Sequence, residues 1–411
     1  MNPPRPIFGQ SHDGGPFAGV FAFLPIDKVI FGPGVVGSLA AEIDRVGGRR
    51  VLVVTGTTLA TRTGLVEKIR ALLGDRCVGV FSDTVQHVSR ASVLAATDMA
   101  RELDVDALVS FGGGSPIDTA KAVAMCLAED VRTGGDLDRL HFRMEPDGLV
   151  APPITGTLIP HVAISTTLSA GEFTGYTGIT DPDRRHKDAY GTPAMTPRVV
   201  FLDPELATAT PSWLWASTGM RAIDHCVESV YSIRHQPFAD ALCLRALEML
   251  VAALPRAAAD PSDVEALGAC QVAMWMSIFS LHNIPAGMSH GIGHQLGARC
   301  DLPHGVCSAI MLPEVMDYNR PVTAARQRLV AEALGVDVAG TSDDAAAAAA
   351  AQALRDLVSQ LGIKNRLSDW GITPDDLPLV ASDAVQDFMN ATNPVPVTDA
   401  AVIEGLLRRV L

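Results

Sequence analysis

The first half of the chain alternates short apolar runs with longer segments of helical spacing. The apolar runs are rich in β-branched residues and predict buried strands at residues 28–31, 50–55, 78–81 and 107–111. Helical spacing lies between them, over residues 35–46, 65–73 and 90–103. Strands that alternate with helices of this length predict a parallel sheet covered by helices on both faces. Two further apolar runs, 161–165 and 199–202, are candidates for additional strands of the same sheet.

From about residue 211 onward the pattern is helical only. Helices are predicted at residues 213–233, 237–254, 264–281 and 323–334. Ser342 is placed to cap a further helix, whose first turn carries Asp343 and Asp344. The sequence therefore predicts an α/β protein with a parallel-sheet domain at residues 1–210 and an all-helical domain at residues 211–411. A cleft between the two domains is the expected ligand site.

Composition narrows the class of protein. The 411 residues are 48% hydrophobic and 19% charged, which is typical of a folded chain of two or three domains. The net charge of −14 argues against nucleic acid or an anionic membrane as the partner. The uncharged stretch at residues 266–298 is interrupted by polar residues, so we expect a buried helix and a polar loop rather than a membrane span. Seven cysteines without a C-x-x-C spacing predict reduced thiols in a cytoplasmic protein.

A glycine run follows the strand predicted at residues 107–111. Glycines at the end of a strand let backbone N–H groups approach a phosphate, and the following helix adds partial positive charge. We expect Ser115 to be the N-cap, Pro116 the first helical residue, and Asp118 either a capping-box partner or a cofactor contact. The spacing is not G-x-G-x-x-G, so the usual Rossmann fingerprint is absent. The glycines of this candidate cofactor-binding loop are Gly112, Gly113 and Gly114.

Four more positions are candidates for the cofactor or the chemistry. Thr166 and Thr167 follow a predicted strand, where hydroxyls either bind a diphosphate or a nicotinamide amide, or cap a turn. Tyr176 is a secondary catalytic candidate and Lys187 a secondary cofactor-binding candidate. The alternative for each of these two is a solvated loop residue.

Histidines mark the helical half. His290 and His294 share one helix face, and His304 follows after a proline-containing turn. Arg221 and His225 lie one turn apart on another predicted helix. Several histidines near a segment with few charges favour a functional site over ordinary core histidines.

Three segments resemble the iron-containing, or group III, alcohol dehydrogenase family. They are GGGSPIDTAKAVA, HGIGHQLG with the later LPHG, and DPEL at residues 203–206. The resemblance implies a dinucleotide-binding N-terminal domain, a helical C-terminal domain and a dimer. It also implies a metal held by one aspartate and three histidines, whose histidine positions match His225, His290 and His304. The position of the aspartate is Arg221 here.

Arg221 changes the expected chemistry, because a guanidinium cannot ligate a divalent cation. We expect Asp224 to be a poor substitute, since it lies about 100° around the helix from His225. Three features resemble the metal-independent maleylacetate reductases. They are the missing metal-ligand carboxylate, the TTLSAGEFT segment and the Gln86–Val88 segment. SPIDTAKA, in contrast, resembles the alcohol dehydrogenases, and the reductases usually carry asparagine where Arg221 stands. The prediction is a protein without a bound metal.

The resulting hypothesis is hydride transfer from NADH or NADPH to a small anionic substrate, a keto or enoic acid with one or two carboxylates. Arg221, or a protonated His225 or His304, would stabilise the oxyanion, and His294 or His304 would donate the proton. With His290, these side chains are expected to form a small positive pocket. Gly56 stands where NAD-selective relatives carry an acidic residue, so either cofactor is admissible.

Three alternatives remain open at this stage. The first is a metal-dependent alcohol dehydrogenase of small alcohols or aldehydes that tolerates Arg221. The second is a lyase or synthase similar to the dehydroquinate synthases, which share the two-domain architecture. The third is a binding protein built on a decayed active site.

Overall fold

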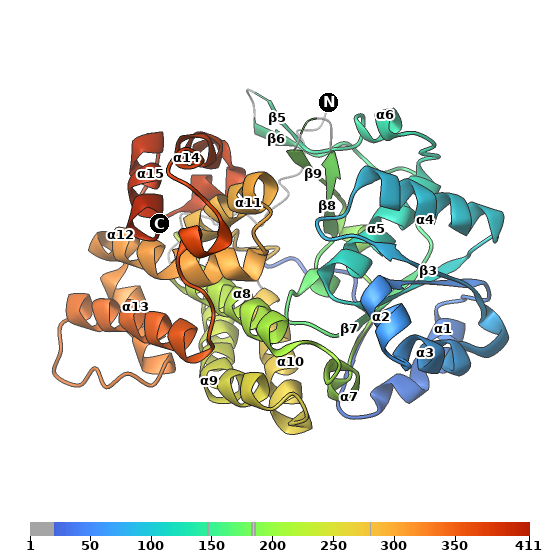
Figure 1. The fold of residues 1–411 in the computed structure, drawn as a ribbon, viewed down its shortest axis with the longest axis horizontal. Helices are drawn as coiled ribbons and strands as arrows, with labels where there is room; N and C mark the ends of the chain where they lie inside the picture. The colour runs from blue at the N-terminus through green and yellow to red at the C-terminus, as the bar shows by residue number, and fades with distance from the viewer. Residues whose placement is uncertain (1–19, 146–147, 182–183, 185, 280) are drawn as a thin grey trace. The chain divides into compact units, whose positions relative to one another are not determined.

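The computed structural model describes residues 20–145, 148–181, 184, 186–279 and 281–411. They form two compact units: the α/β unit, residues 23–210, and the helical unit, residues 211–411 together with 20–22 (Figure 1).

A six-stranded parallel sheet is the centre of the α/β unit, with strand order β1-β10-β7-β4-β2-β3. Every residue of β4, β7 and β10 is buried, which is the near-continuous apolar pattern of a sheet covered on both faces. The two candidate strands, β7 and β10, are confirmed as members of this sheet. In sheet order the strands are Lys28–Phe31, Val199–Leu202, His161–Ser165, Ala107–Gly112, Val51–Gly56 and Cys77–Thr84.

Helices cover both faces of this sheet, as predicted. Val51 and Val53 of β2 belong to one hydrophobic cluster, whereas Leu52 and Val54 belong to another, because successive side chains of a strand point to opposite faces. The first cluster includes residues of α1 and α3, and the second includes residues of α4 and α5. The helices are α1 Leu39–Arg45, α2 Thr57–Arg62, α3 Leu65–Leu73, α4 Arg90–Glu102, α5 Gly114–Ala128, α6 Gly134–Leu137 and α7 Pro204–Ala207.

Some elements of this unit differ from the predicted ones. The helix expected at residues 35–46 is a 3₁₀ turn, Val35–Ser38, followed by the shorter α1. Two antiparallel hairpins that were not predicted are also present. They are formed by β5 Arg143–Glu145 with β6 Gly148–Val150, and by β8 Tyr176–Asp181 with β9 His186–Gly191.

The described residues of the helical unit contain helices and no strands (Figure 1). Ser342 accepts a hydrogen bond from the Ala345 N–H and caps α13, as predicted. The helix expected at 323–334 was wrong in its start: α12 begins at His304 and contains Pro313 and Pro321, residues that usually interrupt a helix. The helices are α8 Ser212–Tyr231, α9 Pro237–Ala259, α10 Val264–Ile278, α11 Met288–Cys300, α12 His304–Ala333, α13 Asp343–Gln360, α14 Leu377–Gln386 and α15 Ala400–Arg409.

The uncharged stretch at 266–298 comprises most of α10, a connection and the first turns of α11, in agreement with the prediction. Among the described helices, none combines the length and apolar character needed to cross a membrane. All seven cysteines lie within the described residues, and none of them forms a disulfide.

Candidate active site

Helix α8 carries four polar side chains toward the interior of the helical unit. Asp224, His225 and Glu228 are buried, and Arg221 is half-buried. Because Arg221, His225 and Glu228 follow at intervals of four and three residues, they share one face of the helix. Buried charged groups persist only with partners, so the partners of these side chains determine the site.

The Glu228 carboxylate binds the start of α11. Oε2 accepts a hydrogen bond from the Gly287 N–H at 2.6 Å, and Oε1 accepts one from the Ser289 N–H at 2.8 Å. The carboxylate thus satisfies N–H groups that the first turn of a helix leaves unpaired. A Cβ at residue 287 would lie 2.8 Å from Glu228 Oε1, so this close approach requires the glycine.

The same carboxylate fixes the orientation of His290. Nδ1 of His290 lies 2.8 Å from Glu228 Oε2, so Nδ1 donates its hydrogen there and Nε2 carries the lone pair. His290 Nε2 is buried and has no hydrogen-bond partner among the described residues. The ring of His225 lies 5.1 Å from the ring of His290. The structure therefore brings these two predicted histidines together.

Asp224 also faces His290, a contact that the sequence did not predict. Asp224 Oδ2 accepts a hydrogen bond from Ser289 Oγ at 2.9 Å and lies 3.4 Å from His290 Nδ1. The angle between Asp224 and His225 around α8 does not determine which residues Asp224 contacts. Asp224 precedes Glu228 by four residues, so the two carboxylates point to α11 together.

His294 and His304 form a second group. Nδ1 of His294 lies 3.0 Å from Oδ2 of Asp387, the residue that caps the 3₁₀ turn Phe388–Thr392. His304 is the first residue of α12, and its ring stands edge-on to the ring of His294 at 6.1 Å. Burial acts to raise the pKa of Asp387, but the neighbouring His294 and the hydrogen bonds hold that pKa below its usual range. Sequence reasoning missed Asp387, which is 93 residues from His294.

The electrostatics differ from the small positive pocket that was predicted. Burial lowers the pKa of His290 to about 3 and that of His225 well below its usual range, with the charge of Arg221 acting in the same direction. Both imidazoles are therefore neutral at pH 7. Burial also raises the pKa of Asp224 to about 6 and raises that of Glu228. Arg221 thus stands beside neutral histidines and two carboxylates, not in a ring of cations.

In the α/β unit, the glycine loop leads from β4 into α5. Gly112 has a φ of 142°, and a Cβ at residue 112 would lie 3.0 Å from Pro116 Cγ. A Cβ at residue 113 would lie 2.9 Å from the Thr167 side chain. The Thr166 N–H donates to the Gly112 carbonyl at 2.9 Å. The predicted glycines and threonines therefore come together, with a backbone approach that only glycine permits.

The details of the helix start were predicted incorrectly. Gly113 is the N-cap of α5 and makes no side-chain cap, whereas Ser115 and Pro116 are its second and third helical residues. Asp118 does not complete a capping box; its Oδ1 lies 3.2 Å from Nζ of Lys121. The first N–H groups of α5 thus lack a side-chain cap, which is the arrangement of an anion-binding helix start.

Lys121, which sequence reasoning missed, joins α5 to the segment after the threonines. Its fully buried Nζ donates to the carbonyls of Gly171 and Tyr176 at 2.6 and 2.9 Å, and to Thr174 Oγ1 at 2.8 Å. Tyr176 begins β8 and Lys187 lies in β9, paired with Thr180. The solvated-loop alternative is therefore wrong for both residues, and their predicted roles stay predictions.

Gly56 ends β2 and precedes α2. A Cβ there would lie 3.7 Å from Thr84 Oγ1, an ordinary contact, so packing does not demand a glycine.

Two family profiles match the chain over nearly its whole length. The profile of the iron-containing alcohol dehydrogenases matches residues 26–204, and that of the C-terminal part of the Fe-containing alcohol dehydrogenase family matches residues 215–410. The chain belongs to the iron-containing alcohol dehydrogenase family. It is an oxidoreductase, and the family uses NAD(P)H.

Relatives in this family have different substrates. The NAD-dependent methanol dehydrogenase of Bacillus methanolicus is 32% identical over 375 residues, covering 90% of this chain and 95% of the relative. The maleylacetate reductase of Sphingobium indicum is 28% identical over 391 residues, covering 95% and 97%. A solved 1,3-propanediol oxidoreductase superposes with a TM-score of 0.87 at 28% identity, covering 95% of this chain and 100% of that one. Overall identity therefore does not decide whether this chain acts like the alcohol dehydrogenases or like the maleylacetate reductases. The residues of the site have to distinguish the two.

The metal donors implied by the family resemblance are incomplete here, but a different set lies nearby. Donor atoms of Asp224, Glu228 and His290 lie within 4.8 Å of one another. However, the Glu228 oxygens already accept two backbone N–H groups, and His290 offers this set Nδ1, the atom hydrogen-bonded to Glu228. Metal binding here would break these hydrogen bonds, and the charge of Arg221 opposes a further cation. This donor set does not fit a resident divalent cation.

Proposed function

We propose that this chain is a reductase that uses NADH or NADPH to reduce a keto or enoic dicarboxylic acid of the maleylacetate type without a bound metal. The observation that carries the proposal is Arg221. It replaces the carboxylate of the family's metal site, and its Nη1 is buried without a hydrogen-bond partner among the described residues. A buried charged donor of this kind is satisfied by an anionic ligand.

The glycine loop fits a dinucleotide, because Gly112, Gly113 and the uncapped start of α5 leave N–H groups for a diphosphate. Thr166 and Thr167 lie beside this loop and extend the polar surface. The absence of an acidic side chain at Gly56 leaves a 2′-phosphate unopposed, so both cofactors are admissible. NADH or NADPH, when bound, supplies the hydride.

In the helical unit, Arg221 offers a planar fork for a substrate carboxylate or for the oxygen that gains negative charge. The buried pairing with Glu228 keeps His290 in one tautomer, with Nε2 as the acceptor. We assign the proton donation to His294, because the Asp387 carboxylate orients its ring and compensates positive charge on it. His304, whose ring is edge-on to His294, is the second candidate for this step.

The test compares substrates and metal content in one preparation. Purified enzyme is analysed for iron and zinc, and oxidation of NADH and NADPH is followed with maleylacetate and with simple aldehydes, before and after chelation. We expect oxidation with maleylacetate that chelation leaves unchanged. Stoichiometric metal whose removal abolishes activity would overturn the metal-independent mechanism, and activity confined to aldehydes would overturn the substrate.

A metal-dependent alcohol dehydrogenase is the second candidate. Asp224, Glu228 and His290 converge, but a cation would bind there only by displacing the hydrogen bonds that Glu228 and His290 now make. This second candidate predicts that iron or zinc restores aldehyde reduction in a chelated sample. We also propose a homodimer, which sedimentation velocity tests directly.

A further inference from the structure

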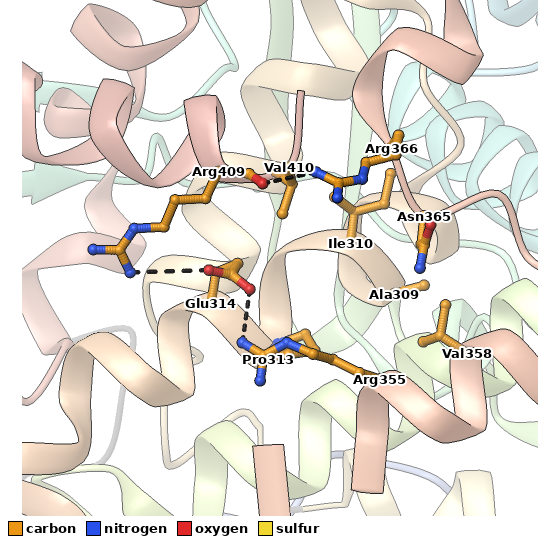
Figure 2. A pocket seen from close by; sticks show the side chains of 10 residues that line it. All are labelled: Ala309, Ile310, Pro313, Glu314, Arg355, Val358, Asn365, Arg366, Arg409 and Val410. Carbon is orange, nitrogen blue, oxygen red and sulfur yellow. Dashed lines mark hydrogen bonds and ion pairs between the residues drawn. The ribbon is translucent and has the colours of Figure 1, made fainter. Parts of the chain in front are cut away.

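Along α12, polar groups near the surface are paired, whereas several buried polar groups beside it are not. Figure 2 shows a hollow between α12, α13 and the end of α15 whose arginines bind other parts of the chain. Arg355 donates to Glu314 at 2.7 Å, and Arg366 donates to the carbonyl of Arg409 at 2.9 Å. Where α12 packs against α8, in contrast, buried polar atoms have no hydrogen-bond partner among the described residues. Such atoms indicate where the helical unit receives a ligand.

Three helices contribute to this cluster of unpaired atoms. The atoms are Nη1 of Arg221 and Oδ1 of Asp224 on α8, Nε2 of His290 on α11, and Oγ of Ser308 on α12. Asp224, His290 and Ser308 are at most 1% exposed. Oδ2 of Asp224 lies 3.4 Å from Nδ1 of His290. Burial raises the pKa of Asp224, and the neighbouring Arg221 and Ser308 oppose that rise, so both lie close to this carboxyl.

Donors and acceptors in the cluster define what a ligand must carry. Because Nδ1 of His290 donates to Glu228, Nε2 of His290 can only accept, whereas Arg221 can only donate. The Ser308 hydroxyl can rotate to donate to Oδ1 of Asp224. The two atoms that remain are one acceptor, on His290, and one donor, on Arg221. Carboxylate, keto and enoic groups offer no hydrogen to the acceptor, but a hydroxyl group does.

We propose that the reduced member of the substrate pair is a hydroxy acid, whose hydroxyl donates to Nε2 of His290 and whose anionic oxygens accept from Arg221. This inference rests on the proposed function and specifies its reacting bond as a carbonyl. The hydride of NADH or NADPH goes to the carbonyl carbon, the second bond of C=O breaks, and the oxygen takes the proton from His294, the donor proposed above. His290 is then a specificity-determining residue, because a ligand without the hydroxyl leaves its buried Nε2 unpaired.

Two dicarboxylates with the same six-carbon chain distinguish the reacting bonds. Maleylacetate contains a carbonyl and a carbon–carbon double bond, whereas 3-oxohexanedioate contains only the carbonyl. Oxidation of NADH and NADPH is followed with each, and the products are identified by NMR. We expect both to be reduced, each to a product with a hydroxyl group, and 3-hydroxyhexanedioate to reduce NAD⁺ or NADP⁺ in the reverse direction.

The possible failures are distinct. Conversion of maleylacetate to 3-oxohexanedioate that proceeds no further would overturn this inference and leave the proposed function intact. No oxidation of either cofactor with either dicarboxylate would overturn the proposed function, and this inference with it.

Binding tests the role of His290 directly. Calorimetry compares 3-hydroxyhexanedioate with hexanedioate, which differs only by the missing hydroxyl, and we expect the wild type to bind the first at least about tenfold more tightly. His290→Asn retains an N–H group for Glu228 but loses the Nε2 acceptor, so this preference should fall below about threefold. His186→Asn, at an exposed position of β9, is the control and should keep the preference.

Thermal unfolding verifies that His290→Asn is folded, and the comparison of the two ligands in the wild type decides the question without any variant. Equal Kd values for the two ligands in the wild type would overturn the inference. A preference that folded His290→Asn retains in full would also overturn it.

Discussion

The Glu228 carboxylate accepts a hydrogen bond from His290 Nδ1 at 2.8 Å while both of its oxygens bind N–H groups at the start of α11. One buried side chain of α8 therefore positions both a helix and an imidazole. The orientation of His290 is a consequence of helix packing, and it leaves Nε2 as the acceptor.

Replacing Glu228 by Gln should destabilise the helical unit. The amide has one acceptor oxygen where two are used, so at least one buried N–H loses its partner, at a cost of about 1–3 kcal/mol. Thermal unfolding followed by circular dichroism measures the loss. Glu265→Gln, at an exposed position of α10, is the control and should unfold as the wild type does. Equal stability of the two variants would contradict the role assigned to Glu228.

Arg221→Asp should convert the site toward metal binding. The substitution removes the cation beside His225 and His290 and adds a carboxylate at the position that resembles the family's metal ligand. We expect iron or zinc to be retained through purification by this variant and the reduction of dicarboxylates to be lost, as measured by elemental analysis and by cofactor oxidation. Arg245→Asp, on the exposed surface of α9, carries the same charge change and should alter neither property.

Asp387→Asn should slow catalysis if His294 donates the proton. The amide cannot compensate positive charge on His294, so we expect kcat to fall about a hundredfold or more, within the range known for general acids, and its pH profile to change. Asp383→Asn, on the neighbouring α14 and paired with Arg299, is the control. An unchanged kcat in Asp387→Asn would transfer the role to His304.

Gly113→Ala should weaken cofactor binding without unfolding the α/β unit. The added methyl group would lie 2.9 Å from the Thr167 side chain, so the loop must shift away from its present path. We expect the Kd for NADH or NADPH, measured by fluorescence, to rise about tenfold or more. Gly37→Ala, where a Cβ meets nothing within 4 Å, should bind the cofactor normally.

His161 should make stability depend on pH. Burial, with a contribution from Lys121, lowers the pKa of His161 to about 3 from its usual 6.5. Above pH 6.5 both the folded and the unfolded chain hold it neutral, so it has no effect there. As the pH falls below 6.5, only the unfolded chain takes up the proton, and the folded state loses about 2 kcal/mol by about pH 5.

The matching variant is His161→Gln, which retains a side chain able to bond Ser110 Oγ, the present partner at 2.8 Å. Its free energy of unfolding should change less between neutral and acidic pH than that of the wild type. Parallel curves for the two proteins would show that this histidine does not contribute to the acid sensitivity.

Much of the α/β unit was predictable from local pattern. β1, β7 and β10 and helix α3 have the predicted bounds, because the apolar runs and helical spacing that define them are properties of neighbouring residues. The glycine loop was found for the same reason. The start of α12 was missed, because prolines usually interrupt a helix and only packing shows that these two do not.

The sequence by itself determined the strands of the parallel sheet, most helices, the glycine loop and the histidines by which this chain resembles its family. Only the tertiary structure decided what those histidines contact. Glu228 and His290 are 62 residues apart, and Asp387 and His294 are 93 residues apart. Periodicity shows which face of a helix is buried but not which distant helix covers it. The partner of a buried carboxylate, and the tautomer and charge of the histidine that it binds, are therefore set by packing alone.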